Sequence, residues 1–546
     1  MKKVFQKLFI FFSQSKLTFV DFLVSFGALL ILNLLFQFLT YGFHTVSFEY
    51  LLGIVLQMYY PLLFFSLVIF LYFLLRPHFT TKEKIWQHVF ILVLWGFWGI
   101  VFWPLIDKLI LGNSFYLSYY LYGGAAELGR AFITFFGPLK PVGILYGTRI
   151  EMALIILFLS GYIYFLTRSW WKGMLAGLGV YILFFLSVAW PSLIVLLKSW
   201  LSGQDLAKVN DLTVVKFFNT PLYFFGQERR IMTVAFFYKI SLFYNLILLT
   251  LLFWWQWLSA KKRLLALLKN IRWPQMIFNW GLFGLGIGLA WLSFPSNFSW
   301  TIWNVLVVLN LLLAILFVWL FAVIINDLSD QSIDQLSNRQ RPLITGQITE
   351  RTYLLYGISF LILAAFFSLA VSGKIFSLLV VYVFLTLIYS RPPFRLKAWP
   401  IISGLVAAAA SILLLFSGYI LISPKQELTA MPWRFVFFLL LAYGLILPIK
   451  DIKDIVADRQ QGVLTIANLL GEKAARVYFG IIIFSAYLFS VLIIRLPILF
   501  FPAMLAGLIS FFIVINPKNR RNKLLFKLLG VIVAYLLIIV GLIYFN

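Results

Sequence analysis

Two acidic segments with the same internal spacing contain the side chains of this sequence that are best suited to chemistry. Each follows a long apolar run, a setting in which an ionised carboxylate is costly and is usually functional. Only 18 Asp and Glu residues occur among 546, and the two segments contain six of them. We call residues 327–334 the first acidic segment and residues 451–458 the second. Their aspartates are Asp327, Asp330 and Asp334 in the first, and Asp451, Asp454 and Asp458 in the second.

The spacing of these aspartates predicts a metal site for a phosphorylated ligand. On an α-helix, positions i, i+3 and i+7 share one face, so each segment would present three carboxylates together. Six facing carboxylates need cations, and a ligand set made only of oxygens favours Mg²⁺, which shares the phosphate oxygens of a substrate. Arg341 follows the first segment and Lys450 precedes the second. Carboxylates, Mg²⁺ and basic side chains together predict a diphosphate site. The alternative is two solvated helix ends whose acids pair with nearby Lys and Arg.

The composition predicts an all-α polytopic membrane protein. Hydrophobic residues make up 63% of the chain and charged residues 11%, and apolar runs of bilayer-spanning length recur throughout. Cysteine is absent from the sequence and its three histidines lie far from the acidic segments, which excludes thiolate sites and argues against a His-based metal site. The net charge of +26 is spread over short loops, so it indicates topology and lipid contact, and we expect no nucleic-acid partner.

The apolar runs divide the chain into two parts. We expect an N-terminal transmembrane domain over residues 1–260, of unknown role, and a second domain over residues 261–546. Basic residues concentrate on one side if the N-terminus is cytoplasmic, and both acidic segments then face the cytoplasm. The expected spans are 17–42, 50–75, 86–106, 145–167, 173–197 and 233–258 in the first part, and 276–294, 302–326, 352–372, 375–390, 399–422, 433–450, 475–494, 498–515 and 524–544 in the second.

The second part resembles the UbiA superfamily of intramembrane prenyltransferases. NDLSDQSID, followed by RP, is similar to the first motif of that family, which adds Asn326 to the three aspartates. KDIKDIVADRQQGVLTIANLLG is similar to the second motif, and NIRWPQMIFN resembles the opening of the domain, with Arg272 and Asn279 as its matches. The resemblance covers roughly residues 264–546 and implies a nine-helix bundle.

The resemblance also implies roles for these residues. An isoprenyl diphosphate would bind through Mg²⁺ held by Asn326 and the six aspartates, and an aromatic or lipid acceptor would attack the prenyl group. Asp330, Asp334, Asp454 and Asp458 would act directly in the departure of diphosphate. Arg272, Arg341, Lys397 and Lys450 would bind the diphosphate, and Asn279, Tyr389 and Arg395 would line the substrate pocket.

One loop departs from the pattern of the family. YSRPPFRLK separates Tyr389 from Lys397 by eight positions, where many members have Tyr-x-x-x-Lys. Its form resembles a subgroup that includes chlorophyll and archaeal lipid synthases, and this leaves the class of acceptor open. Two other functions also stay open: a transferase that moves a phosphoribosyl group to a polyprenyl phosphate, and a non-catalytic transporter or scaffold. The sequence identifies no protein partner.

The charged residues of the first part, Asp21, Arg149, Glu151 and Lys239, fit two interpretations. They could line a pathway, or they could form structural ion pairs between helices, and the second is the commoner case.

Overall fold

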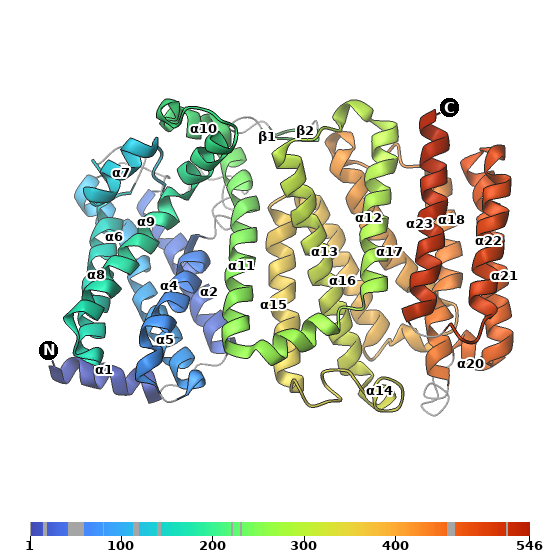
Figure 1. Ribbon diagram of the computed structural model, residues 1–546, viewed down its shortest axis with the longest axis horizontal. Helices are drawn as coiled ribbons and strands as arrows, with labels where there is room; N and C mark the ends of the chain where they lie inside the picture. The colour runs from blue at the N-terminus through green and yellow to red at the C-terminus, as the bar shows by residue number, and fades with distance from the viewer. Residues whose placement is uncertain are drawn as a thin grey trace. The chain divides into compact units, whose positions relative to one another are not determined.

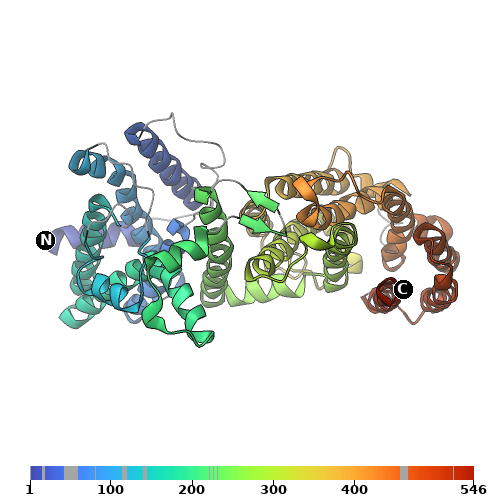
Figure 2. The same ribbon diagram turned by 90° about the horizontal axis from the view of Figure 1, so that it is seen from above.

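The computed structural model divides the chain into two compact units. The first comprises residues 1–222 and 229–261, and the second comprises residues 223–228 and 262–546. Both units are helical, as the composition predicts (Figures 1 and 2). The structure describes residues 2–14, 19–41, 59–79, 81–112, 120–138, 144–219, 222–225, 227–229, 232–455, 465–519 and 522–545.

Nine long helices build the second unit in its described residues, as predicted. All nine are long and apolar enough to cross a membrane when the adjoining 3₁₀ turns are counted with α18 and α22. In Figure 1 they run side by side, up and down between two ends of the unit. They are α12 (Trp273–Ser293), α13 (Ile302–Ser329), α15 (Glu350–Leu369), α16 (Gly373–Ser390), α17 (Ile402–Ile422), α18 (Trp433–Ile446), α21 (Glu472–Ile494), α22 (Phe500–Ile515) and α23 (Asn522–Phe545).

Small residues allow α12 and α17 to pack backbone against backbone. A Cβ atom at Gly286 would lie 2.0 Å from the carbonyl oxygen of Leu415, and a Cβ atom at Gly418 would lie 2.0 Å from that of Phe283. The two contacts are reciprocal, so each helix presents a glycine to the other. Within a bilayer, close approach of this kind supplies the packing energy that hydrophobic burial supplies in water.

Short elements mark the two ends of the second unit. α14 (Gln331–Ser337) and α20 (Ile466–Leu470) lie at the end where α13 finishes (Figure 1). At the opposite end, the backbone N–H of Phe225 donates to Asn304 Oδ1 at 3.2 Å, near the start of α13. Phe225 belongs to the turn of a two-stranded hairpin, β1 (Leu222–Phe224) and β2 (Gln227–Arg229). This hairpin is a small exception to the all-helical prediction.

The first unit agrees only in part with the predicted spans. The span expected at 86–106 is wrong as a single helix, because α5 ends at Phe97 and a 3₁₀ turn at Trp98–Val101 separates it from α6. The span expected near 50–75 has its described part in α4, and residues 42–58 lie outside the described residues. The helices are α1 (Lys2–Gln14), α2 (Phe19–Tyr41), α4 (Tyr59–Leu75), α5 (Lys82–Phe97), α6 (Trp103–Leu111), α7 (Ala125–Ile133), α8 (Tyr146–Thr167), α9 (Trp170–Leu201), α10 (Asp211–Asn219) and α11 (Met232–Lys269), whose backbone angles leave the helical region at Ala260.

Arg149 and Glu151 have separate environments in the first unit. The Arg149 guanidinium donates to backbone carbonyls of the turn after α7, including Gly137 at 2.6 Å and Phe136 at 3.2 Å. Glu151 lies against the 3₁₀ turn, where its Oε1 would be 3.0 Å from a Cβ atom added to Gly99. Arg149 therefore stabilises a turn through carbonyl groups, and the expected ion pair is not the interaction that holds it.

The packing of α12 on α17 yields a stability prediction. Gly286→Ala would place a methyl group against a backbone carbonyl that cannot rotate away, so we expect the thermal midpoint in detergent to fall by at least about 3 °C. Gly288→Ala on the same helix is the control, because a Cβ atom there meets no atom within 4 Å. A midpoint for Gly286→Ala equal to that of Gly288→Ala would contradict the described packing.

Candidate functional site

The first acidic segment lies where α13 ends and the chain turns into α14. Asp330 has φ −112° and ψ 20°, outside the helical region, so the segment is two helices joined at this residue. The continuous helical stripe expected from the spacing is therefore wrong. The side chains still converge, because the backbone N–H of Asp334 donates to the carbonyl of Asp330 at 2.8 Å and continues the turn.

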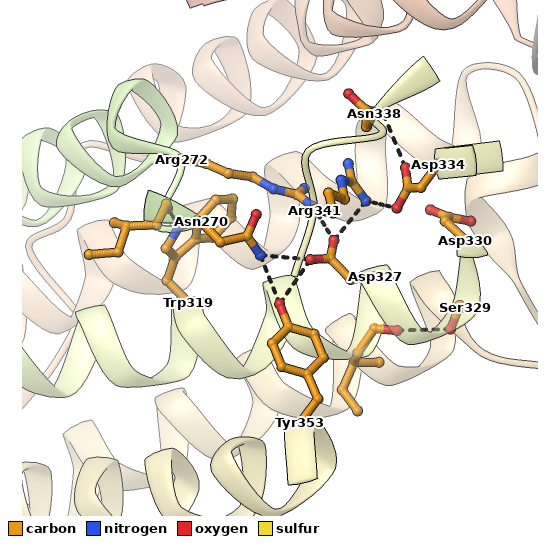
Figure 3. Close-up of polar contacts among 12 residues, drawn as sticks. Asn270, Arg272, Trp319, Asp327, Ser329, Asp330, Asp334, Asn338, Arg341 and Tyr353 are labelled. Atoms are coloured by element: carbon orange, nitrogen blue, oxygen red, sulfur yellow. Dashed lines mark hydrogen bonds and ion pairs between the residues drawn. The ribbon is translucent and has the colours of Figure 1, made fainter. Parts of the chain in front are cut away.

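Asp327 is enclosed by four donor groups and is 1% exposed. Its Oδ1 accepts from Arg272, in a short contact, and from Arg341 at 2.7 Å. Its Oδ2 accepts from Asn270 Nδ2 at 2.7 Å and from the Tyr353 hydroxyl at 2.9 Å. Figure 3 shows the carboxylate at the centre of these four side chains.

Asp334 and Asp330 pair with different cations. Arg341 extends from Asp327 to Asp334, where it makes a second ion pair, and Asn338 Nδ2 donates to Asp334 at 3.1 Å. Asp330 pairs with Lys397, and a guanidinium nitrogen of Arg395 lies 3.7 Å from the same oxygen. The loop between α16 and α17 thus contributes cations to the first acidic segment.

The second acidic segment begins in a 3₁₀ helix, Leu447–Asp454, instead of the expected α-helix. Positions i and i+3 of a 3₁₀ helix align, so the backbone places residues 451 and 454 on one face. Lys450 donates to the Tyr389 hydroxyl at 3.1 Å, and its ammonium lies 5.3 Å from the centre of that ring. The side chain of Asp454, and Asp458 entirely, lie outside the described residues.

A single cavity of about 800 Å³ joins the two acidic segments. Residues from both line it, together with the cations of the intervening loop and of the segment before α12. The oxygens that side chains bring to this lining belong to carboxylate, amide and hydroxyl groups. Within the described residues, no group of three or more Asp, Glu or His side chains is placed so that it could hold a metal ion by itself. The predicted site residues in the lining are Arg272, Asn326, Asp330, Asp334, Arg341, Tyr389, Lys397, Lys450 and Asp451.

Burial changes the ionisation of two groups at this cavity. It raises the pKa of Asp334 to about 6, against the opposing effect of the Arg341 guanidinium. It lowers the pKa of the Lys397 ammonium, and the Asp330 carboxylate acts in the other direction.

Three predicted residues do not line the cavity. Asp327 is covered by its donors, Asn279 is buried within α12, and Arg395 approaches only through its contact with Asp330. Two partners of Asp327 were missed by sequence reasoning. Asn270 opens the NIRWPQMIFN motif and could have been noticed there, whereas Tyr353 has no local signal, because its role depends on the packing of α15 against α13.

The segment that carries Asn270 and Arg272 is held rigidly between α11 and α12. Trp319 Nε1 donates to the carbonyl of Ile271 at 2.7 Å, and Arg272 has left-handed backbone angles at the N-terminus of α12. Ala266 and Tyr353 pack in one apolar cluster beneath it. These contacts set the direction in which Arg272 leaves the backbone.

A family model now identifies this half of the chain. The UbiA prenyltransferase family matches residues 281–542. Residues 281–542 belong to that family. The match contains both acidic segments. It begins after Arg272 and Asn279, so it does not include the NIRWPQMIFN motif, whose resemblance to the family rests on the sequence of the motif itself.

Curated relatives cover part of the same region. A probable chloroplastic homogentisate phytyltransferase 2 from Oryza sativa subsp. japonica is 32% identical over 161 residues, which are 28% of this chain and 42% of the relative. A digeranylgeranylglyceryl phosphate synthase from Sulfolobus acidocaldarius is 26% identical over 167 residues, 30% of this chain and 58% of the relative. The chain thus spans about half the length of these relatives.

Solved structures of UbiA homologues also resemble the chain. One from Archaeoglobus fulgidus, bound to DMAPP and Mg²⁺, is 20% identical with a TM-score of 0.38 and covers 49% of this chain and 96% of its own. An apo homologue from Aeropyrum pernix K1 is 18% identical with a TM-score of 0.38, over 48% of this chain and 97% of its own.

The position of Arg341 in the cavity lining predicts that its guanidinium contributes to anion binding. Arg341→Gln removes a cation from the lining, so we expect the affinity for inorganic pyrophosphate, at saturating Mn²⁺, to fall by about 10-fold to 100-fold. Isothermal titration calorimetry on the purified full chain measures it. Arg434→Gln, at an exposed position that does not line the cavity, is the control, and equal affinities for the two variants would contradict the site.

Proposed function

We propose that the second unit is a membrane-embedded, Mg²⁺-dependent prenyltransferase. It moves an isoprenyl group from an isoprenyl diphosphate to a hydrophobic aromatic or lipid acceptor. The observation that carries this proposal is the cavity in which carboxylates of both acidic segments meet cations from neighbouring segments. The family of residues 281–542 and the named activities of the relatives support the same class of reaction.

The lining fits a hard divalent cation. Asn326, Asp330, Asp334 and Asp451 offer oxygen ligands on one cavity, and we propose that Asp454 and Asp458 complete the set. Mg²⁺ commonly takes one or two carboxylates and fills its remaining positions with water and substrate phosphate. Bound there, it would add positive charge at the oxygens of the diphosphate.

The side chains of this chain can account for the departure of diphosphate. The bond between the first carbon of the isoprenyl group and the diphosphate oxygen breaks, and its electron pair leaves with the diphosphate. The negative charge that develops is stabilised by the cations of the lining. The allylic carbon then accepts an electron pair from the acceptor, whose proton passes to the departed diphosphate. The cations are Arg272, Arg341, Lys397 and Lys450.

The apolar surroundings can hold the prenyl chain and the acceptor. Phe278 stacks on Tyr443 with ring centres 4.6 Å apart, and Tyr382 is buried in the same bundle. Aromatic faces of this kind stabilise a nearby cation. We propose that the interior next to Tyr389 accepts the hydrophobic substrates.

Prenyl transfer tests the proposed function directly. Purified protein is incubated with labelled geranylgeranyl, farnesyl or geranyl diphosphate, Mg²⁺ and a panel of phenolic, quinol and glycerol-lipid acceptors. We expect a prenylated product, and a loss of at least about 100-fold in rate for Asp330→Ala and for Asp454→Ala. Arg434→Gln serves as the control of unchanged rate.

Other outcomes of this assay favour the alternative functions. Transfer of a phosphoribosyl group from phosphoribosyl diphosphate to a polyprenyl phosphate would replace the proposal with that reaction. Diphosphate binding without any transfer would indicate a transporter or scaffold.

We also propose that the cavity faces the cytoplasm of a cell membrane. The cavity end carries exposed Arg339 and the cations of the lining, which is the arrangement that cytoplasmic loops favour.

Single introduced cysteines test this orientation, because the native sequence contains none. Gln340→Cys is exposed at the cavity end, and Thr429→Cys is exposed in the loop after α17 at the other end. In intact cells we expect an impermeant maleimide to label Thr429→Cys and to label Gln340→Cys only after the membrane is opened. The reverse pattern would overturn the proposed orientation.

A further inference from the structure

We propose that Asp327 is a positioning residue that holds two arginines against the diphosphate, and that it is not a metal ligand. This inference rests on the proposed function, since it assigns a role within the same site. It separates Asp327 from Asp330 and Asp334, although all three belong to one acidic segment with regular spacing.

Hydrogen-bond donors already fill the lone-pair positions of the Asp327 carboxylate. A carboxylate offers about four lone-pair positions, two on each oxygen. Arg272 and Arg341 occupy Oδ1, and Asn270 and Tyr353 occupy Oδ2. A metal ion bound by Asp327 would have to displace a hydrogen bond made by a donor from another part of the fold.

The Asp327 side chain points away from the cavity. Asp330 and Asp334 line the cavity, as does Asn326, the residue immediately before Asp327. Asp327 is 1% exposed and is not part of the lining. Successive residues of a helix point about 100° apart, so α13 directs Asn326 toward the cavity and Asp327 toward the protein.

The two arginines that contact Asp327 belong to the cavity lining. Arg272 and Arg341 both line the cavity, and both are fixed through the same oxygen of Asp327. Arg341 is also shared with Asp334, so its guanidinium lies between a covered carboxylate and a cavity-lining one. A guanidinium fixed in this way presents its remaining N–H groups to an anion with little loss of conformational freedom.

Side chains from three segments of the fold converge on Asp327. Arg272 and Asn270 come from the segment before α12, Arg341 from the loop after α14, and Tyr353 from α15. Figure 3 shows these side chains approaching the carboxylate from separate ribbons. One carboxylate therefore fixes three segments relative to one another, and two of them, the segment before α12 and the loop after α14, line the cavity.

The test compares Asp327→Asn with Asp330→Asn by calorimetric titration of inorganic pyrophosphate into the purified full chain at increasing Mn²⁺. For Asp327→Asn we expect pyrophosphate affinity to fall at least about 10-fold at every Mn²⁺ concentration, with the Mn²⁺ midpoint within about 3-fold of wild type. For Asp330→Asn we expect the Mn²⁺ midpoint to rise at least about 10-fold, so that added Mn²⁺ restores much of the affinity. A Mn²⁺ midpoint for Asp327→Asn shifted as far as that of Asp330→Asn would overturn the proposal.

Two further variants separate positioning from a general loss of structure. Tyr353→Phe removes one donor from Oδ2, and we expect a loss of pyrophosphate affinity of about 3-fold with an unchanged Mn²⁺ midpoint and thermal midpoint. The double variant Arg272→Gln with Asp327→Asn should lose less affinity than the sum of the two single losses, because part of the effect of Asp327 passes through Arg272 and the rest through Arg341. Additive losses in the double variant would contradict the proposal.

The outcomes for this inference and for the proposed function are distinct. A wild-type protein that binds Mn²⁺ and pyrophosphate but transfers no prenyl group would contradict the proposed function and leave the role of Asp327 in place. A wild-type protein that binds no pyrophosphate at any Mn²⁺ concentration would overturn both. Prenyl transfer by the wild type, together with a Mn²⁺ midpoint for Asp327→Asn shifted as far as that of Asp330→Asn, would contradict the positioning role of Asp327. It would leave the proposed function in place.

Discussion

The neutralisation of buried carboxylates is the constraint on which the rest of this site depends. An unpaired carboxylate in an apolar helical bundle is strongly disfavoured, so each described acid of the first segment is placed against a cation. Asp327 takes Arg272 and Arg341, and Asp330 takes Lys397. The same cations face the cavity. A diphosphate that binds in the cavity would therefore meet cations whose positions are already fixed by neighbouring carboxylates.

This constraint explains why loops carry so much of the site. Arg341 and Lys397 lie between helices, where the backbone can bring a long side chain to a helix end. The glycine contacts of α12 with α17 keep the bundle itself rigid. Rigid helices and short connecting loops together hold the cations at fixed positions, which is the property that stabilises a leaving group without reorganisation during the reaction.

Sequence reasoning predicted most of the charged residues that line the cavity, but not how their charges pair with one another. The spacing of the aspartates, their rarity and their apolar setting are local signals, and the nine helices of the second unit follow from hydropathy. The break at Asp330 and the 3₁₀ helix around Asp451 could not be read from spacing, because both depend on how neighbouring segments pack. Tyr353 lacks any motif, and only the fold brings its hydroxyl to Asp327. In the first unit, Arg149 found carbonyl partners that no pattern of charges would indicate.

Hydrogen bonds hold a buried histidine in place in the first unit. His88 is buried between Ser13 and the Tyr162 hydroxyl, at 3.2 Å and 2.8 Å. These contacts join α1, α5 and α8 and explain how an amphipathic N-terminal helix is fixed to apolar ones.

An experimental structure of the full chain with Mn²⁺ and pyrophosphate tests the central claim most directly. Anomalous scattering from Mn²⁺ locates the metal independently of the protein atoms. We expect a Mn²⁺ peak within about 2.5 Å of oxygens of Asp330 or Asp334, with the pyrophosphate between the two acidic segments and in contact with Arg341. A Mn²⁺ peak bound to Asp327, or pyrophosphate outside this cavity, would contradict this claim.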